Sequence, residues 1–353
     1  MERRERRGEE GALLDLAEEK LGRGDAAGAL RAADEVCRKV PGDVRGLHLR
    51  AAALADLGRT DEARRAYEQA LERGRDDPAL LADAASFLVG EGEREPSTED
   101  LERGLSLARR GIRLAGADDA LSGELALVEG QALCSLGDPE GALPRLAEAK
   151  RALPEEPSAH VEHALALFEL CRFEEAGREL DRAVELFPED AWAHHARGRV
   201  AERLGRRPEA KRSFARAHEL APEEFPRSLS LSPAAFDRAV EAAVKELPEP
   251  VRRYLSNVAI TVEALPSEEE LTASDPPLSP SILGIFRGAP LGEKRSPDPW
   301  SQFPSSITLY QRNLETFARD EQELKEEIGV TLFHEVGHFL GLDEEQLRQR
   351  GLG

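Results

Sequence analysis

The apolar and small residues of the first two thirds of the chain recur with a period of 34. Equivalent turn positions are held by Gly24, Gly58, Gly137, Cys171 and Gly205, and an alanine follows each of them after five residues. In the later units a proline closes the repeat, at Pro154, Pro188 and Pro222. A turn residue between two amphipathic stretches, with a proline at the end, predicts two helices per repeat. We therefore expect six stacked helix pairs, ending near residues 41, 75, 116, 154, 188 and 222.

The third unit is longer than the others, because 41 residues separate Arg75 from Gly116. The surplus falls in the polar segment GEGEREPSTED at 90–100, which we expect to be a loop or a break in the stack. Such repeats bury their hydrophobic faces against one another, so the stack should form an all-α superhelix with a concave surface.

The period stops after Pro222, and the pattern of the last third predicts a small α+β domain. Ser232 before Pro233 is typical of a helix start, and a second short helix is expected at 250–255. Strands are predicted at 258–262, 281–288 and 306–310, with an acidic loop at 266–281 and a Pro/Gly-rich segment at 289–304 that flanks a cleft. A last helix from Asp320 to Leu340 carries the apolar stripe Ile328, Leu332, Val336 and Leu340. The expected organisation is a repeat domain at 10–222, a linker at 223–232 and a second domain at 233–353.

The charge of the chain limits its partners. With 69 acidic and 48 basic residues the formal net charge is −21, which disfavours nucleic acid and anionic membrane surfaces. The three scattered cysteines lack the spacing of a disulfide framework or a CxxC site, and the N-terminus MERRERRGEE lacks the apolar core of a signal peptide. These features predict a soluble cytoplasmic protein.

The predicted last helix contains the segment FHEVGHFLGLDEE at 333–345, which carries the candidate chemistry. His334 and His338 are four residues apart, so both lie on one face of a helix, about 200° from the apolar stripe. Two such imidazoles can bind zinc, and Glu335 can act as general base on a water activated by the metal. Gly337 inside the helix costs about 1 kcal/mol relative to alanine, which suggests close packing near the site.

A third zinc ligand is expected after the helix. Gly341 ends the helix three residues after His338 and lets the chain turn back toward the histidines. Glu344 is the preferred ligand because it lies three residues after Gly341, where the longer motif HExxHxxGxxH has its last histidine. Asp343 is the alternative. Histidine pairs elsewhere, His160 with His163 and His194 with His195, lack such a context and are expected to be packed or solvated.

The repeats resemble tetratricopeptide repeats, as in LGRTDEARRAYEQAL at 57–71 and LGRRPEAKRSFARAHELAP at 204–222. The resemblance implies a groove that binds a protein or peptide segment. Carried over by position, the groove residues would be His48, Gln131, Val161, Phe168, Trp192 and His195. For Trp192, packing on a neighbouring repeat is an equal alternative to ligand contact.

Residues 233–352 resemble the small bacterial zincin-like metallopeptidases with a minimal matrix-metalloprotease-like fold. The matching blocks are FDRAVEAAVKELPEPVRRYLSNVAITVEALP (236–266), LGIFRG (283–288), ITLYQRNLE (307–315) and TLFHEVGHFLGLDEEQL (331–347). The resemblance implies a Zn²⁺-dependent peptidase acting on a peptide substrate, and the chain departs from the family pattern at Phe339 and Glu344. A substrate peptide would add to a strand edge near 282–287 or 306–310, and Tyr310 is a candidate to stabilise the oxyanion.

Two functions follow from these patterns. The first is a zinc peptidase whose repeats recruit or position a protein partner or substrate. The second is an interaction scaffold in which the repeats work and the metallopeptidase-like domain is weak or inactive.

Overall fold

The computed structural model describes residues 2–90, 96–227, 229–255, 258–288, 305–343 and 346–347. The chain divides into two compact units, Met1–Ala166 and Leu167–Gly353, and each is described by itself. The segments 91–95 and 289–304 lie outside the described residues, and with them most of the expected loop of the third repeat and the segment expected to flank a cleft.

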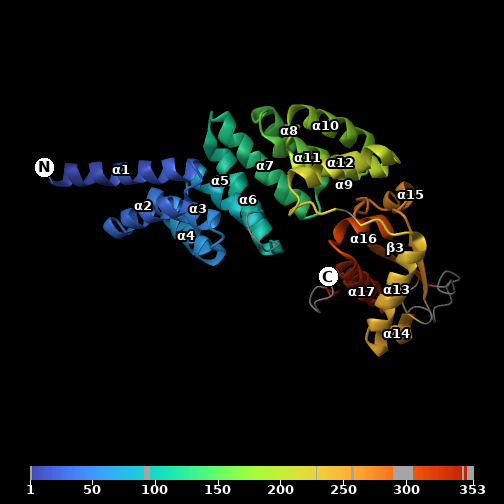
Figure 1. Ribbon diagram of the computed structural model, residues 1–353. Helices are drawn as coiled ribbons and strands as arrows, with labels where there is room; N and C mark the ends of the chain where they lie inside the picture. The colour runs from blue at the N-terminus through green and yellow to red at the C-terminus, as the bar shows by residue number, and fades with distance from the viewer. Residues whose placement is uncertain are drawn as a thin grey trace. The chain divides into compact units, whose positions relative to one another are not determined.

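Six helix pairs form the repeat region, as the 34-residue period predicts (Figure 1). In order they are α1 (Glu2–Gly22) and α2 (Ala26–Lys39), α3 (Val44–Asp56) and α4 (Thr60–Arg73), α5 (Pro78–Val89) and α6 (Thr98–Ala115), α7 (Asp119–Ser135) and α8 (Pro139–Ala152), α9 (Pro157–Glu169) and α10 (Phe173–Leu186), and α11 (Ala191–Arg203) and α12 (Arg207–Leu220). The expected loop at 90–100 is too long, because Ser97 caps α6 by accepting the backbone N–H of Asp100 and the helix starts at Thr98.

The turn positions of the period have a shared backbone conformation. Gly24, Gly58, Gly137 and Gly205 have φ between 69° and 81°, in the left-handed region that glycine enters without steric cost. Cys171 adopts the same conformation with φ 57°. Because the turns share this backbone conformation, the 34-residue period is kept in repeats whose other residues differ.

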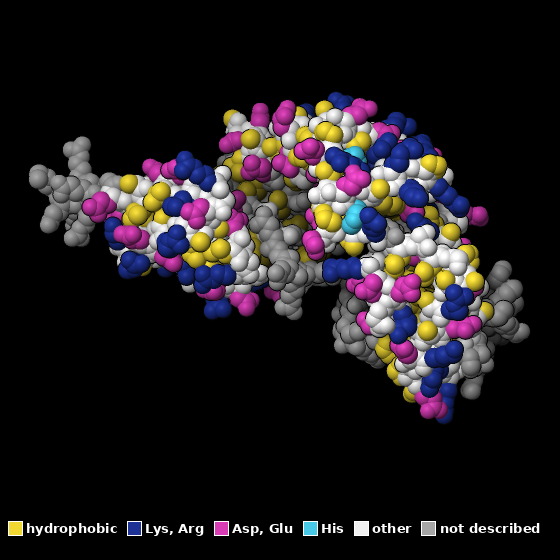
Figure 2. All heavy atoms as spheres, in the orientation of Figure 1, with side chains coloured by type: hydrophobic (Ala, Val, Ile, Leu, Met, Phe, Trp, Pro, Cys, Tyr) yellow, Lys and Arg dark blue, Asp and Glu magenta, His cyan; other side chains and the backbone are white. Residues whose placement is uncertain are grey.

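Acidic and basic side chains are interspersed on the surface of the repeat helices. Figure 2 shows acidic and basic side chains intermixed over the visible face of the repeat region. Two of the histidines have the same structural role one period apart: Nε2 of His160 lies 3.2 Å from the carbonyl oxygen of Pro154, and Nε2 of His194 lies 3.0 Å from that of Pro188. For His160 and His194 these contacts agree with the packed alternative of the expectation that such histidines are packed or solvated.

The last third folds around a three-stranded sheet. Its elements are α13 (Pro233–Glu246), α14 (Glu249–Leu255), β1 (Ala259–Glu263), α15 (Glu268–Leu271), β2 (Gly284–Arg287), β3 (Ser306–Tyr310), α16 (Gln311–Phe317) and α17 (Glu321–Phe339). The short helices α15 and α16 were not predicted. The strand order is β1-β3-β2, with β1 parallel and β2 antiparallel to β3.

The core of this part lies between one face of the sheet and α17. Ile307 and Leu309 of β3 are fully buried in one cluster with Leu324, Ile328 and Leu332 of α17. The expected stripe is therefore confirmed up to Val336, which is 2% exposed. The prediction for the last residue of the stripe is wrong. Leu340 is 39% exposed, because α17 ends at Phe339 and Phe339 takes the buried position.

Hydrogen bonds join the last repeat to the C-terminal elements within the unit Leu167–Gly353. Arg203 of α11 donates to the carbonyl oxygen of Pro266 over 2.7 Å, and Nε of Arg312 in α16 donates to Glu202 over 3.0 Å. The segment expected to be a linker at 223–232 thus connects two parts of one compact unit.

Candidate metal centre

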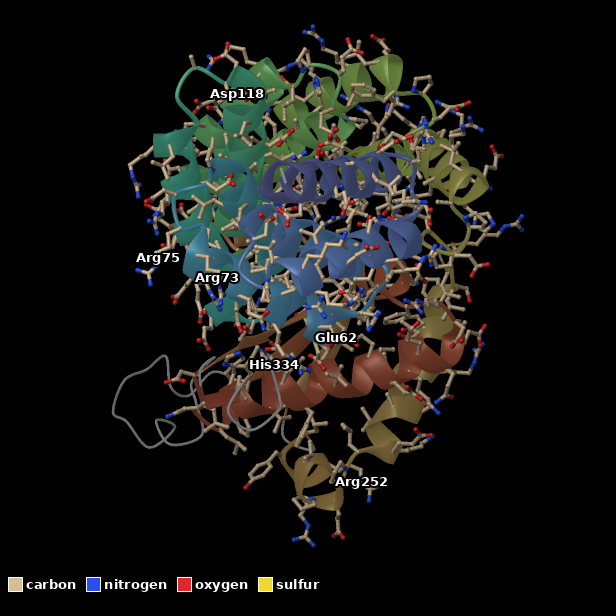
Figure 3. The ribbon with its side chains drawn as sticks, turned by 90° about the vertical axis from the view of Figure 1, so that its left-hand side faces the viewer. Glu62, Arg73, Arg75, Asp118, Arg252 and His334 are labelled. Atoms are coloured by element: carbon tan, nitrogen blue, oxygen red, sulfur yellow. The ribbon has the colours of Figure 1, made fainter. Side chains whose placement is uncertain are left out.

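His334 and His338 lie one turn apart on α17 with their rings together; His334 is labelled on that helix in Figure 3. Their Nε2 atoms are 3.1 Å apart. Two nitrogens, each about 2.0–2.1 Å from one tetrahedral zinc ion, would be about 3.3 Å apart. The spacing of the pair therefore fits chelation of a single ion.

A backbone contact sets the orientation of His338. Its Nδ1 lies 3.1 Å from the carbonyl oxygen of Leu342, which can only accept. An N–H on Nδ1 leaves the lone pair on Nε2, the atom that faces His334. The ring is thus held in the tautomer that a metal ligand requires.

The chain after α17 folds back onto the helix. Gly341 has φ 86°, and the amide of Leu342 donates to the carbonyl oxygen of Gly337 over 3.0 Å. A Cβ at Gly337 would lie 2.2 Å from Cδ2 of Leu347, so a larger residue there would move this leucine from its place. The close packing inferred from Gly337 is confirmed, and its cause is Leu347, which is fully buried.

Asp343 has a structural task in the same segment. Its Oδ1 accepts the backbone N–H of Gln346 over 2.8 Å, while Oε1 of Gln346 accepts the backbone N–H of Asp343 over 3.1 Å. This reciprocal pair of hydrogen bonds has the pattern of a capping box, with Asp343 as the capping residue. Asp343 is also exposed. Glu344, the preferred third ligand, lies outside the described residues, and among the described ones no three His, Cys, Asp or Glu side chains converge.

Glu335 lies between the two histidines in sequence and is 6% exposed. A general base next to two metal-ligating histidines in the sequence fits the pattern of a zinc hydrolase. The donor set of two histidines on one helix face, with a glycine turn returning the chain, fits zinc chemistry.

Tyr310 is not brought to the histidines. Side chains alternate along β3, so Tyr310 lies on the face opposite Leu309, whose side chain is in the cluster with α17. Its hydroxyl donates to Oε2 of Glu270 in α15 over 2.7 Å, and burial followed by this carboxylate raises the pKa of Tyr310. Nothing in this arrangement supports a role for Tyr310 at an oxyanion.

Among the described strands β1 and β2 lie at the two edges of the sheet, and β3 lies between them. β3 pairs on both sides, so the expectation of a peptide adding at 306–310 is wrong, whereas β2 pairs only with β3 among the described strands. A Cβ at Gly284 of β2 would lie 2.7 Å from Cγ2 of Thr331, which precedes His334 by three residues on α17. β2 therefore packs against α17, with Gly284 beside Thr331 and the ring of Phe286 5.7 Å from that of Phe339.

The residues expected in the repeat groove differ in their exposure. Val161 and Phe168 are buried, at 0% and 2%. His48 and Gln131 are hydrogen-bonded to acids of the next repeat, Asp83 at 2.6 Å and Glu162 at 3.3 Å. Trp192 and His195 stack on each other and on Phe225, with ring centroids 4.7–5.7 Å apart, which is the packing alternative for Trp192.

Three family models match the chain. Residues 255–352 match the zincin-like metallopeptidase model, and residues 44–87 and 127–194 match two tetratricopeptide repeat models. The chain joins tetratricopeptide repeats to a zincin-like metallopeptidase domain. The zincin-like family implies zinc, and tetratricopeptide repeats in general bind protein or peptide partners.

Solved structures support the helical repeat architecture. PilF of Pseudomonas aeruginosa is 16% identical, with 66% of this chain and 98% of that chain covered at a TM-score of 0.51. PilW, described as a widely conserved type IV pilus biogenesis factor, is 17% identical, with coverages of 61% and 94% and a TM-score of 0.53. At these identities the likeness shows the fold alone. No curated protein matches the chain, and none of the described helices has the length and hydrophobicity to cross a membrane.

Sequence reasoning missed a pair of arginines, Arg199 and Arg203 of α11, which line a cavity beside the zincin-like domain. Arginines four residues apart are common on exposed helix faces, so their spacing carries no signal by itself. Their aromatic partners, Phe168 and Phe173, come from the preceding repeat and only the fold places them there.

Proposed function

We propose that the protein is a zinc-dependent peptidase whose tetratricopeptide repeats recruit or position a protein substrate. The observation that carries this is the histidine pair on α17, with Nε2 atoms 3.1 Å apart and His338 held through Nδ1 by the carbonyl of Leu342. His334 and His338 would hold the metal, and Glu344 completes the set because Asp343 is used as a helix cap.

Bound zinc would polarise the scissile carbonyl and lower the pKa of the attacking water. Glu335 would take the proton from that water and return it to the leaving amine. Its position directly after His334, on a buried part of α17, supports this role. The contact between Nδ1 of His338 and Leu342 keeps the imidazole fixed while charge develops.

The free edge of β2 supplies a way to hold an extended substrate. Backbone groups of Gly284–Arg287 would pair with a peptide strand and place its scissile bond alongside the histidine face of α17. Main-chain hydrogen bonds give affinity but little preference for the sequence of the peptide. We assign selection of the substrate protein to the repeats.

Zinc binding and cleavage test the proposal separately. Zinc-loaded wild-type protein should hold about one zinc per chain and cleave an unfolded protein substrate. His334→Ala should lose the zinc, whereas Glu335→Ala should keep it and lose cleavage by a factor of about 10³ or more. Wild-type protein that holds no zinc after loading would refute the site.

The third ligand is tested by a matched pair. Glu344→Gln removes a carboxylate and should weaken zinc binding strongly, whereas Asp343→Asn keeps a cap oxygen and should leave it nearly unchanged. The opposite ranking would make Asp343 the ligand. Zinc binding without cleavage by the wild type would favour the interaction scaffold.

A further inference from the structure

A cavity of about 270 Å³ lies within the unit Leu167–Gly353, between the last repeats and the zincin-like domain. Its walls come from the end of α9, from α11, from the segments around residues 265 and 281–283, and from α16. The zincin-like family match begins at residue 255, so this cavity is built by both parts of the chain.

Two guanidinium groups line the cavity in a protein whose net charge is −21. Arg199 lies over the ring of Phe168 at 4.8 Å and donates to Oγ of Ser281; Arg203 lies over the ring of Phe173 at 4.9 Å. The stacked rings hold both planar groups in fixed orientations. Burial lowers the pKa of both arginines, which nevertheless stay charged at neutral pH.

The donors of this arginine pair are not all used. Arg203 donates to the carbonyl of Pro266, yet its Nε is buried and has no hydrogen-bond partner among the described residues. Leaving a buried charged donor without an acceptor is unfavourable, so this N–H is available to an acceptor that enters the cavity. Neither Arg199 nor Arg203 makes a hydrogen bond to a carboxylate within the described part of the chain.

Three acids lie near the arginine pair: Glu202 and Glu169, and Glu268, whose charge acts on Arg203. Glu202 lines the cavity but accepts Nε of Arg312 over 3.0 Å. Burial raises the pKa of Glu169, whose carboxyl also interacts with Ser279 and, through charge, with Arg199. His195 on the same wall is neutral at physiological pH, because burial and then the charge of Arg199 lower its pKa to about 4. Arg199 and Arg203 are thus the charged donors that the cavity wall offers to a ligand.

Apolar groups occupy the rest of the wall. Leu265 and Leu283 are half-buried, and Phe317 is 58% exposed. The side-chain amide of Asn313 donates hydrogen bonds to the carbonyl oxygens of Pro280 and Ile282, which fixes that side of the cavity. A ligand that fits has a flat anionic group for the guanidinium pair and an apolar body for the leucines and the phenylalanine.

We infer that the Arg199–Arg203 cavity is a binding site for a small organic carboxylate with an apolar body. A carboxylate matches the forked guanidinium geometry with two parallel hydrogen bonds. A dianionic phosphate would suffer more repulsion from Glu202 and would leave the apolar wall uncovered. This site goes beyond the proposed peptidase function and does not depend on it.

Benzoate is the probe, with benzamide as its neutral analogue and inorganic phosphate as an anion without an apolar body. Titration into the full-length protein, followed by NMR signals of His195 and Trp192, should show saturable binding of benzoate. Benzamide and phosphate should bind at least tenfold more weakly. Equal binding of benzamide, or equal binding of phosphate, would overturn the inference.

Variants locate the site. Arg199→Gln and Arg203→Gln should each weaken benzoate binding about tenfold or more, while Arg212→Gln, an exposed arginine of α12, should leave it unchanged. Glu169→Gln should strengthen binding, because it removes a carboxylate that interacts with Arg199. Unchanged affinity in both cavity variants would overturn the assignment. If either fails to fold, the comparison of the three probes on the wild type still decides.

Discussion

Two glycines of α17 have opposite roles. Gly337 is required by packing, because a Cβ there would lie 2.2 Å from Leu347, whereas at Gly329 the nearest atom would be 4.0 Å away, in Leu247. The helical backbone favours alanine over glycine by about 1 kcal/mol at both positions. Only the surroundings distinguish them.

Gly337→Ala should therefore destabilise the protein by about 1–3 kcal/mol or displace Leu347, and Gly329→Ala should stabilise it by about 0.5–1 kcal/mol. Denaturant unfolding of full-length protein measures both. If Gly337→Ala is as stable as Gly329→Ala, Leu347 does not pack on the helix.

Titration of His195 should make the stability of the protein depend on pH. Its pKa falls from 6.5 to about 4 on folding, because burial and Arg199 disfavour the charged ring. The unfolded chain therefore takes up this proton at a higher pH than the folded chain, and stability is lost as the pH falls from about 6.5 to 4. The contribution is on the order of 3 kcal/mol.

We expect the loss of stability between pH 7 and pH 4.5 to be smaller in His195→Gln than in wild type. The groups facing His195 are Trp192, Phe214, Phe225 and Arg199, so the titrating side chains elsewhere are common to both proteins. Identical pH profiles of the free energy of unfolding would show that His195 titrates normally.

At the scale of elements, the turn after α17 folds the chain back onto the helix that carries the histidine pair. Gly341 reverses the chain, the capping-box pattern of hydrogen bonds joins Asp343 and Gln346, and Leu347 packs against Gly337. The amide of Leu347 donates to the carbonyl of Asp343 over 2.9 Å, which makes it a reporter for this turn.

Asp343→Ala should remove the cap at a cost of about 0.5–2 kcal/mol and speed hydrogen exchange at Leu347. Zinc affinity should fall less than in Glu344→Gln, because the carboxylate of Glu344 remains. Unchanged exchange at Leu347 in Asp343→Ala would contradict the role of the cap.

At the scale of the molecule, hydrogen bonds and ion pairs join the last repeat to the zincin-like domain. Glu202 of α11 and Glu315 of α16 both accept Arg312, and Glu315 is fully buried and also accepts the backbone N–H of Leu231. Removing one acid leaves a half-buried guanidinium short of a partner.

Glu202→Gln should therefore lower the free energy of unfolding of the full-length protein by about 1–3 kcal/mol. Glu219→Gln, which breaks the exposed pair with Arg216, should change it by less than about 0.5 kcal/mol. Equal effects would mean that the Arg312 network does not hold these elements together.

Elements with a recurring sequence pattern could be predicted, and short elements without one could not. Helix pairs follow from a 34-residue repeat of turn glycines, and the strand at 306–310 follows from its β-branched residues. The helices α15 and α16, of four and seven residues, carry too few positions for a helical pattern to show. Tyr310 was misplaced because alternation along a strand does not say which face meets the histidine helix.

The sequence by itself determined the repeats, the histidine pair and the need for a small residue at Gly337, because each depends on neighbours along one helix or one period. The tertiary structure alone decided that β3 is the central strand and β2 an edge strand, that Leu347 is the group filling the space at Gly337, and that Arg199 and Arg203 meet in a cavity. Those contacts join segments far apart in the chain, and no spacing along the sequence encodes them.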